Sequence, residues 1–271
     1  MADLLAPVDD WPVDTVGVGV TDADTTLEAR GDVDTVLPFA SVTKPLAAYA
    51  VLVAVQDGAL HLDEPAGPEG ATVRHLLAHA SGLSFDDTGP TGAPGARRVY
   101  SNVGFDVLGE LVEQRVGLSF AEHLEHEVLT PLAMHDTVLD GSPAKDARGT
   151  VTDLLAFCRE LLAPTLLDEA LVREATTVAF PGLDGVLPGH GRQRPNDWGL
   201  GFEIKDGKDP HWTGARLSAA SYGHFGQSGS FVVVDPEAGL GIASLADRPF
   251  GDWCRDAWPA LQDAVVDVYG R

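Results

Sequence analysis

The sequence predicts an α/β (α+β) fold, in which an antiparallel sheet flanked by helices is joined to a mostly helical lobe. Strand-like segments occur near both ends of the chain, helical patterns fill the middle, and an amphipathic helix closes the sequence. Strands at both ends with helices between them indicate one sheet assembled from the two termini. We therefore expect residues 1–65 and 198–271 to form the sheet lobe, residues 66–197 to form the helical lobe, and the two to act as a single unit.

The first part of the chain predicts two short strands followed by a buried helix. Residues 15–20 and 27–32 have strand patterns and flank the polar turn TDADTT. Residues 42–56 are apolar on nearly every face, and Gly58 follows as a C-cap. Because a helix that is apolar all round needs apolar neighbours on every side, this helix is expected inside the protein.

The middle of the chain predicts helices, and the last third predicts strands. Helical patterns cover residues 72–80, 101–115, 119–129 and 150–162. Clusters of Gly and Pro indicate loops at 84–96 and 180–195. Strand patterns follow at 198–204, 221–227, 228–235 and 239–247, with the turn PEAG before the last of them. An amphipathic helix is expected at 252–269.

The composition is that of an acidic globular protein. The 271 residues are 44% hydrophobic, which is enough to bury a substantial core, and the formal net charge is −23 at pH 7. Such a surface repels nucleic acids and anionic membranes, so neither is expected as a partner. The first residues contain no basic or continuous apolar segment, and the longest apolar run, 45–55, is too short to span a bilayer, which predicts a cytoplasmic protein. Cys158 and Cys254 are expected to be reduced and buried, and the oligomeric state has no signal in the sequence.

One of only four lysines follows a serine by three residues at the start of the apolar helix. Positions i and i+3 share a helical face, so Ser41 and Lys44 of SVTK are expected to bring a hydroxyl and an amine together. A serine hydroxyl is a poor nucleophile until a neighbouring base takes its proton. Burial would lower the pKa of the lysine amine toward that of a useful base, and the helix N-terminus favours negative charge on the serine. The pair therefore predicts nucleophilic catalysis.

A second serine–lysine pair of the same spacing is SPAK, from Ser142 to Lys145. It lies in a polar stretch after LDG and has a proline directly after its serine. Because no feature of this stretch buries the lysine or presents the hydroxyl, we interpret it as an exposed loop. Ser41 alone is expected to be the nucleophile.

Six further segments follow SVTK in order: LLAHASGL, YSNVGFDVLGELVEQRVG, PLAMHDT, GTVTDLLAF, WGLGF and GHFGQSGSFVVVDPEAGLGIASL. Together they resemble the serine β-lactamase and penicillin-binding superfamily, and in particular its class C β-lactamase-like branch, which includes family VIII esterases, D-aminopeptidases and DD-peptidases. The resemblance runs from residue 39 to residue 247. It implies a β-lactamase-like fold with the active site in the cleft between the lobes. It also implies acyl transfer to water through an acyl-enzyme, without metal or organic cofactor.

The resemblance assigns catalytic roles to residues of SVTK and YSN. Ser41 and Lys44 match the nucleophile and its lysine partner. Tyr100 matches the tyrosine whose phenol oxygen relays a proton between the serine and the leaving group. Asn102 matches the amide that holds the substrate.

The resemblance also implies a substrate-binding strand edge. His224, Phe225 and Gly226 stand where the family has Lys-Thr-Gly or His-Thr-Gly, and the backbone N–H groups of Ser41 and Gln227 are implied to form the oxyanion hole. Phe225 replaces a threonine whose hydroxyl would contact a substrate carboxylate, and His224 carries a less dependable positive charge than lysine. We therefore expect an esterase-like enzyme that acts on small uncharged esters or amides in preference to penicillins and cephalosporins.

Several alternatives stay open at this point. A β-lactamase or a D-amino-acid peptidase or DD-peptidase is the alternative activity, and a catalytically idle scaffold that binds a ligand or partner is a third possibility. His123 and His126 share a helical face, as metal ligands would, but no third ligand is evident. His79 is interpreted as a structural residue near a helix end, and Trp198 as a core residue that could line the pocket.

Overall fold

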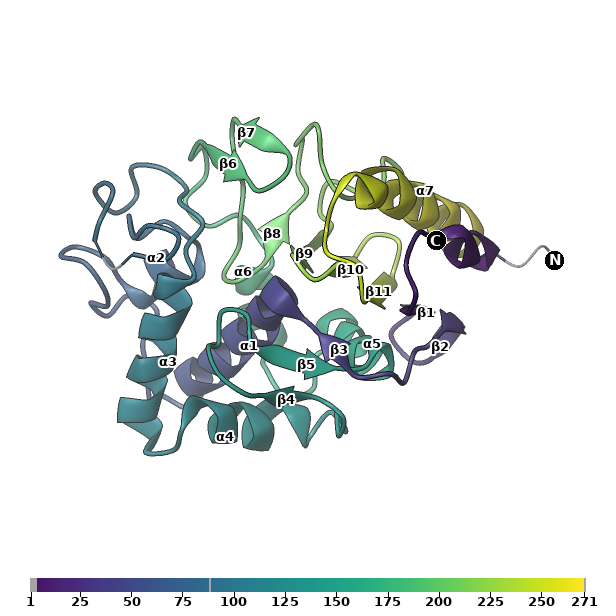
Figure 1. Ribbon diagram of the computed structural model, residues 1–271. Helices are drawn as coiled ribbons and strands as arrows, with labels where there is room; N and C mark the ends of the chain where they lie inside the picture. Colours follow the sequence, from purple (N-terminus) through teal and green to yellow (C-terminus); the bar gives the residue numbers. More distant parts are fainter. Residues whose placement is uncertain (1–3, 88, 271) are drawn as a thin grey trace.

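The computed structural model describes residues 4–87 and 89–270 and is built around one antiparallel sheet (Figure 1). The six strands lie in the order β2-β1-β11-β10-β9-β8. Their bounds are β1 (Val16–Thr21), β2 (Thr26–Gly31), β8 (Glu203–Ile204), β9 (Tyr222–Gly226), β10 (Ser230–Asp235) and β11 (Leu240–Ala246). Strands from both ends of the chain therefore meet at the pairing of β1 with β11, as the sequence predicts.

The longer helices agree closely with the periodicity of the sequence. They are α1 (Thr43–Gln56), α3 (Val103–Val116), α5 (Val151–Leu162) and α7 (Asp252–Tyr269). The shorter ones are η1 (Ala6–Asp10), η2 (Ala40–Val42), α2 (Val73–Leu77), α4 (Phe120–Leu124), η3 (Glu125–Leu129, a π-helical turn) and α6 (Glu169–Ala175). Short strands outside the main sheet are β3 (Leu37–Pro38), β4 (Val138–Leu139), β5 (Ala147–Gly149), β6 (Gly185–Leu187) and β7 (Gly191–Gln193). The sequence patterns do not predict α6 or these five short strands.

Two expected elements are shorter than their patterns indicate. The helix expected at 72–80 ends at Leu77, because His79 has a left-handed backbone with φ of 54°. The strand expected at 198–204 is reduced to the two residues of β8. Gly201 has φ of 90°, and a Cβ there would lie 2.1 Å from the Cβ of Ala48. The segment before β8 is therefore a loop pressed against α1.

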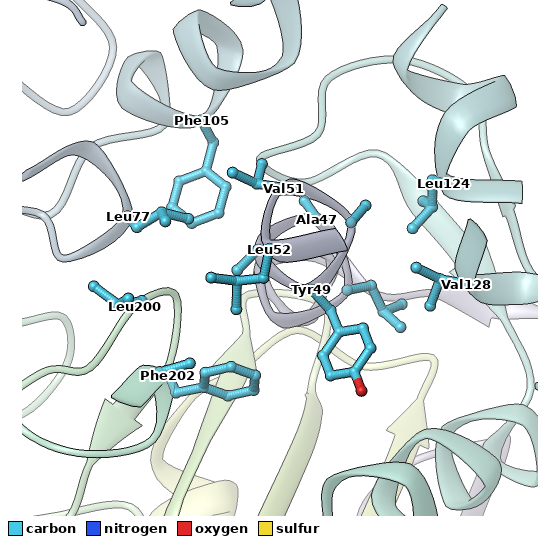
Figure 2. Packing of buried hydrophobic residues seen from close by; sticks show 14 of the residues in the cluster. Ala47, Tyr49, Val51, Leu52, Leu77, Phe105, Leu124, Val128, Leu200 and Phe202 are labelled. Carbon is cyan, nitrogen blue, oxygen red and sulfur yellow. The ribbon is translucent and has the colours of Figure 1, made fainter. Parts of the chain in front are cut away.

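Helix α1 is the centre of the larger hydrophobic core. Every residue from Thr43 to Ala54 is buried, so the helix has no polar face. Figure 2 shows Tyr49, Val51 and Leu52 leaving α1 toward different neighbours, with side chains of other helices and of the segment before β8 around them. This confirms the expectation that the apolar helix is interior.

The two faces of the sheet are covered by different helices. Helix α5 contacts β1, β10 and β11 on the face shared with α1, while α7 contributes to a second core on the opposite face (Figure 1). Helices α3 and α4 contact α1 on the side away from the sheet. The expected division into two lobes stays a prediction. The structure differs from it at α5, which packs on the sheet although its residues lie within 66–197, the range expected to form the helical lobe.

The expectation that both cysteines are unpaired and buried is met in the described residues. Cys158 of α5 and Cys254 of α7 are free and buried, on opposite faces of the sheet. None of the helices within 4–87 and 89–270 is long and apolar enough to cross a membrane.

Candidate active site

Ser41 lies in the single turn η2, directly before α1 and against the end of β9. Ala40 before it has φ of 47°, and Ser41 itself makes no N-cap hydrogen bond to α1. A Cβ at Gly226 would lie 2.3 Å from the carbonyl oxygen of Phe39 and 2.3 Å from Oγ of Ser230. Only glycine permits this approach, which brings the edge of β9 beside the serine turn.

Lys44, in the first turn of α1, is completely buried and points its amine at polar atoms. Nζ lies 3.5 Å from Oγ of Ser41, 2.7 Å from Oδ1 of Asn102 and 2.8 Å from the carbonyl oxygen of Ala144. Burial lowers the pKa of Lys44 from 10.5 to about 7, and Asp106 opposes this while Lys145 adds to it. An amine with this pKa is partly unprotonated at neutral pH, so it can accept the proton of the serine.

The carbonyl of Ala144 was not among the predicted site residues. It belongs to the SPAK turn, where Ser142 donates a hydrogen bond to Asp106 and accepts one from the backbone N–H of Ala144. Lys145 is exposed, as expected of a surface loop. Ser142 is half-buried and its hydroxyl fixes the turn, so this loop supports Lys44 through its backbone. A backbone contact of this kind has no signal in the sequence, because any residue type can supply the carbonyl oxygen.

Tyr100 and His224 form a second polar pair in the site. Nδ1 of His224 lies 2.6 Å from the carbonyl oxygen of Phe225, so that nitrogen carries the ring proton. Burial, assisted by the charge of Lys44, lowers the pKa of His224 to about 3. The neutral ring therefore accepts at Nε2 a hydrogen bond from the hydroxyl of Tyr100, 3.3 Å away. Burial also raises the pKa of Tyr100 above its ordinary value, so the phenol stays protonated.

His79 fixes the position of the YSN segment through a hydrogen bond and ring contacts. Nδ1 of this buried histidine accepts the backbone N–H of Ser101 at 3.2 Å, and its ring lies 4.6 Å from that of Tyr100 and 4.7 Å from that of Trp198. Burial lowers the pKa of His79 well below its ordinary value, which keeps the imidazole a neutral acceptor. Asn102 accepts from Lys44 and donates from Nδ2 to Asp86 at 2.9 Å.

Ser41, Tyr100 and His224 line one small pocket of about 120 Å³, whereas Lys44 and Asn102, the latter predicted to hold the substrate, are not among its lining residues. It is lined by Ser41, Phe85, Tyr100, Leu187, Pro188, Trp198, Glu203, His224, Phe225 and Gln227. Ser41 and Gln227, whose backbone N–H groups are the predicted oxyanion donors, thus face the same space. Phe85, Leu187, Pro188 and Glu203 were not predicted, because they come from loops and a strand edge without a motif.

The sequence and fold of the whole chain match known proteins. The family model described as Beta-lactamase matches residues 4–266. The chain belongs to the Beta-lactamase family. A crystal structure of a β-lactamase from Mycobacterium bovis is 50% identical and superposes with a TM-score of 0.98, covering 99% of this chain and 100% of that one. The predicted superfamily and its α/β fold are confirmed.

Curated relatives of this Beta-lactamase family member align over shorter stretches. Esterase EstB of Burkholderia gladioli is 32% identical over 150 residues, 38% of each protein. The D-alanyl-D-alanine-carboxypeptidase/endopeptidase AmpH of Escherichia coli is 26% identical over 172 residues, 49% of this chain and 45% of AmpH. The alignments thus span less than half the length of these relatives. Simvastatin synthase LovD of Aspergillus terreus, 18% identical with a TM-score of 0.81 and covering 98% of this chain and 97% of that one, shares the fold.

Phe225 and Glu203 line the pocket at the strand edge. Phe225 is buried among aromatic rings of the second core, 4.8 Å from Phe250 and 5.7 Å from Trp212 between ring centroids, and only part of it reaches the pocket. Burial would raise the pKa of Glu203, but the Lys208 ammonium and hydrogen bonds from His211 and Trp212 outweigh it and hold that pKa well below its usual range. The pocket therefore contains a neutral histidine and a fixed, already paired carboxylate.

The structure does not bring the candidate metal ligands into this site. Nε2 of His123 donates to the carbonyl oxygen of Ala50, 3.0 Å away, and the side chain is buried against α1. His126 lies in the following π-helical turn and is exposed. Trp198 is both a core residue and a wall of the pocket.

Proposed function

We propose that the protein is a serine hydrolase of esterase type, which cleaves small esters or amides through an acyl-enzyme on Ser41. The observation that carries the proposal is the buried amine of Lys44, 3.5 Å from Oγ of Ser41, with its pKa lowered to about 7. Of the two nitrogen bases near Ser41, Lys44 has a pKa close to neutral pH and can act as the general base. His224, with a pKa of about 3, is too weak a base for this role.

In the proposed acylation step, Oγ of Ser41 attacks the substrate carbonyl and its proton passes to neutral Lys44. The backbone N–H groups of Ser41 and Gln227 would stabilise the oxyanion, a contribution of about 3 kcal/mol per donor in comparable enzymes. The leaving oxygen takes a proton from the hydroxyl of Tyr100, which regains one from the Lys44 ammonium. Water then attacks the acyl-enzyme by the same route in reverse, and Ser41 is released with its proton.

The preference for esters follows from the groups at the strand edge. A β-lactam presents a carboxylate beside its reacting carbonyl, which needs a cation and a hydroxyl there. This protein offers neutral His224 and the largely buried ring of Phe225. Loss of a charge-assisted hydrogen bond costs about 1.5–3 kcal/mol, or roughly ten- to a hundredfold in binding.

The alternative is a β-lactamase or a D-amino-acid peptidase or DD-peptidase. The 50% identity to the Mycobacterium bovis β-lactamase favours the first of these, whereas the aligned part of EstB favours the esterase. A small-molecule substrate fits the small pocket, and the net charge of −23 argues against nucleic acid or membrane partners. The free, buried Cys158 and Cys254 fit a reducing cytoplasm.

Intact-mass measurement after incubation with short esters, amides and β-lactams tests the proposal. The expected result is a mass increase equal to the acyl group of an ester, located by peptide mapping on Ser41. An adduct on another residue would overturn the assigned nucleophile. A stable adduct with a β-lactam and none with esters would favour the alternative.

A further inference from the structure

A larger cavity opens from the candidate active site. Its volume is about 690 Å³, and it shares Phe85, Tyr100 and Pro188 with the pocket that holds Ser41. Its other walls come from the loop after α2 and from the β6–β7 hairpin, which lie side by side (Figure 1). We call this cavity the arginine groove, since Arg97, Arg98 and Arg192 line it.

Backbone contacts fix the two walls of the arginine groove. Arg98 pairs with Gly185 of β6, and its N–H donates to the carbonyl oxygen of Asp184 at 2.8 Å. A Cβ at Gly185 would lie 2.7 Å from the carbonyl oxygen of Arg98, so the approach requires glycine. In the hairpin, Arg192 of β7 lies directly opposite Val186 of β6. The groove therefore has an apolar and a cationic side chain next to each other on one wall.

The charge of the groove is opposite to that of the protein. Its lining includes the cations Arg97, Arg98 and Arg192 and one carboxylate, Asp184, although the whole chain carries −23. Oδ2 of Asp184 is shared between Arg192 and Arg194, each 3.2 Å away. Exposed Arg97 contacts the carbonyl oxygen of Thr91 at 3.4 Å and has no carboxylate partner within residues 4–87 and 89–270. Ion pairs within the fold therefore leave part of the positive charge of these arginines without a carboxylate to balance it.

Arg98, which lines the groove but is itself buried, adds a further positive charge. Nε and Nη2 donate to the carbonyl oxygens of Asn196 and Ala179, at 3.1 and 2.8 Å. Burial lowers the pKa of Arg98 to about 10, which still leaves it a cation at neutral pH. Carbonyl groups satisfy its hydrogen bonds, and the nearby carboxylate of Asp197, which opposes the lowering of its pKa, offsets part of its charge. The hydrogen bonds themselves leave the charge in place, so Arg98 still adds to the positive potential of the groove.

The lining of the groove changes from apolar near the Ser41 pocket to cationic farther from it. The residues at the junction with the Ser41 pocket are the rings of Phe85, Tyr100 and Pro188, and Phe85 and Val186 are exposed apolar side chains. The exposed arginines line only the part beyond this junction. A substrate extending from Ser41 would therefore meet an apolar stretch first and cations afterwards.

We propose that the arginine groove binds an anionic group, a carboxylate or phosphate, at the far end of an apolar substrate segment whose ester is cleaved at Ser41. This inference deepens the proposed function and rests on it. It is compatible with weak use of β-lactams, because their carboxylate lies beside the reacting carbonyl and not at the distance of Arg97 and Arg192.

The test compares substrates that differ only in a distant charge. For the acyl side, the pair is the p-nitrophenyl ester of suberic acid with a free second carboxylate and the same ester with that carboxylate methylated. For the leaving-group side, the pair is 4-(butanoyloxy)benzoate and its methyl ester. We expect kcat/KM to favour the anionic member of one pair by about five- to twentyfold, as two exposed charge contacts would give.

Two variants and a change of salt concentration separate the groove from general surface charge. Arg97→Gln and Arg192→Gln together should reduce the anionic-to-neutral ratio to about one. Arg194→Gln is the matched control, because it contacts the same oxygen of Asp184 but does not line the groove, and it should keep the ratio. Raising NaCl to 0.5 M should also reduce the ratio in the unmodified protein, since the contacts are exposed.

The outcomes distinguish this inference from the proposed function. Turnover of neutral esters that depends on Ser41, with no anionic preference in either pair, would overturn the inference and leave the function standing. A preference that survives in the double variant would overturn it as well. If no ester is turned over, calorimetry with Ser41→Ala and suberic acid monomethyl ester decides: binding that is lost in the double arginine variant supports the groove, and absence of binding overturns it.

Discussion

The hydroxyl of Tyr100 donates a hydrogen bond to Nε2 of His224 across 3.3 Å. The direction of this hydrogen bond is set by Nδ1 of His224, whose N–H donates to the carbonyl oxygen of Phe225, and by burial, which lowers the pKa of the ring to about 3. Tyr100 is thus a neutral donor and His224 a neutral acceptor at physiological pH. Lys44, with its pKa near 7, remains the group that can take the proton of Ser41.

Lys44→Ala and Tyr100→Phe should each lower kcat/KM for p-nitrophenyl butyrate by about a hundredfold or more, the usual size of general-base effects. Because both residues handle the same proton, the double variant should lose far less than the product of the two single losses. Circular dichroism of each variant checks that the fold is intact. Full activity in Tyr100→Phe would show that the tyrosine is only structural.

The pH dependence of kcat/KM should follow the deprotonation of Lys44. The base must be unprotonated, so activity should rise with pH through about 7 and level off above about 8. Asp106 raises the pKa of Lys44, so Asp106→Asn should move this rise to lower pH. A profile that stays flat down to pH 5 would contradict the assignment of Lys44 as the base.

Burial of Lys44 should also make stability depend on pH. The folded pKa is about 7 against 10.5 ordinarily, so between these values the unfolded chain binds more protons and the free energy of unfolding rises with pH. From pH 7 to 9 the rise due to this group is about 2 kcal/mol. Urea unfolding of the unmodified protein and of Lys44→Met at both pH values measures it.

The comparison with Lys44→Met isolates the lysine from other groups that titrate in this range. Burial raises the pKa of Cys158 and of Cys254 to about 12, and these thiols affect both proteins alike. The difference in unfolding free energy between the two proteins should therefore change by about 2 kcal/mol from pH 7 to 9. An unchanged difference would mean that Lys44 keeps an ordinary pKa.

Ser41→Ala should abolish turnover, whereas Ser142→Ala should retain activity within about threefold. Ser142 acts indirectly, through the turn that presents the carbonyl of Ala144 to Lys44 and through its hydrogen bond to Asp106. Asp146 also holds this turn by accepting the backbone N–H of Ser142 at 2.9 Å. Nitrophenol release by equal amounts of the two variants measures the contrast. Loss of activity in both would indicate that the SPAK turn takes part directly.

Catalytic efficiency on p-nitrophenyl acetate or butyrate should exceed that on nitrocefin, because the strand edge lacks a cation and a hydroxyl for the β-lactam carboxylate. His224→Lys with Phe225→Thr should raise nitrocefin hydrolysis relative to the esters. Since Phe225 packs against Phe250, His224→Lys alone is the companion variant that keeps this core intact. Better hydrolysis of nitrocefin than of esters by the unmodified protein would favour the β-lactamase alternative.

Elements whose signals are local could be predicted from the sequence. The all-apolar pattern around Tyr49 predicted α1, and the amphipathic pattern around Trp258 predicted α7 with its observed bounds. The i, i+3 spacing placed Lys44 beside Ser41, and the ordered motifs identified Tyr100 and His224 as members of the same site. Periodicity and short spacings suffice for such features, because neighbours along the chain make the contacts.

Features that depend on contacts between residues far apart in the sequence could not be predicted in this way. The approach of Gly201 to Ala48 turned most of the expected strand before β8 into a loop. The carbonyl of Ala144 reaches Lys44 across 100 residues, and the lowered pKa of Lys44 follows from the packing of many segments around it. The pairing of Gly185 with Arg98 likewise creates the arginine groove. Burial and charge are sums over neighbours in space, so local patterns do not contain them.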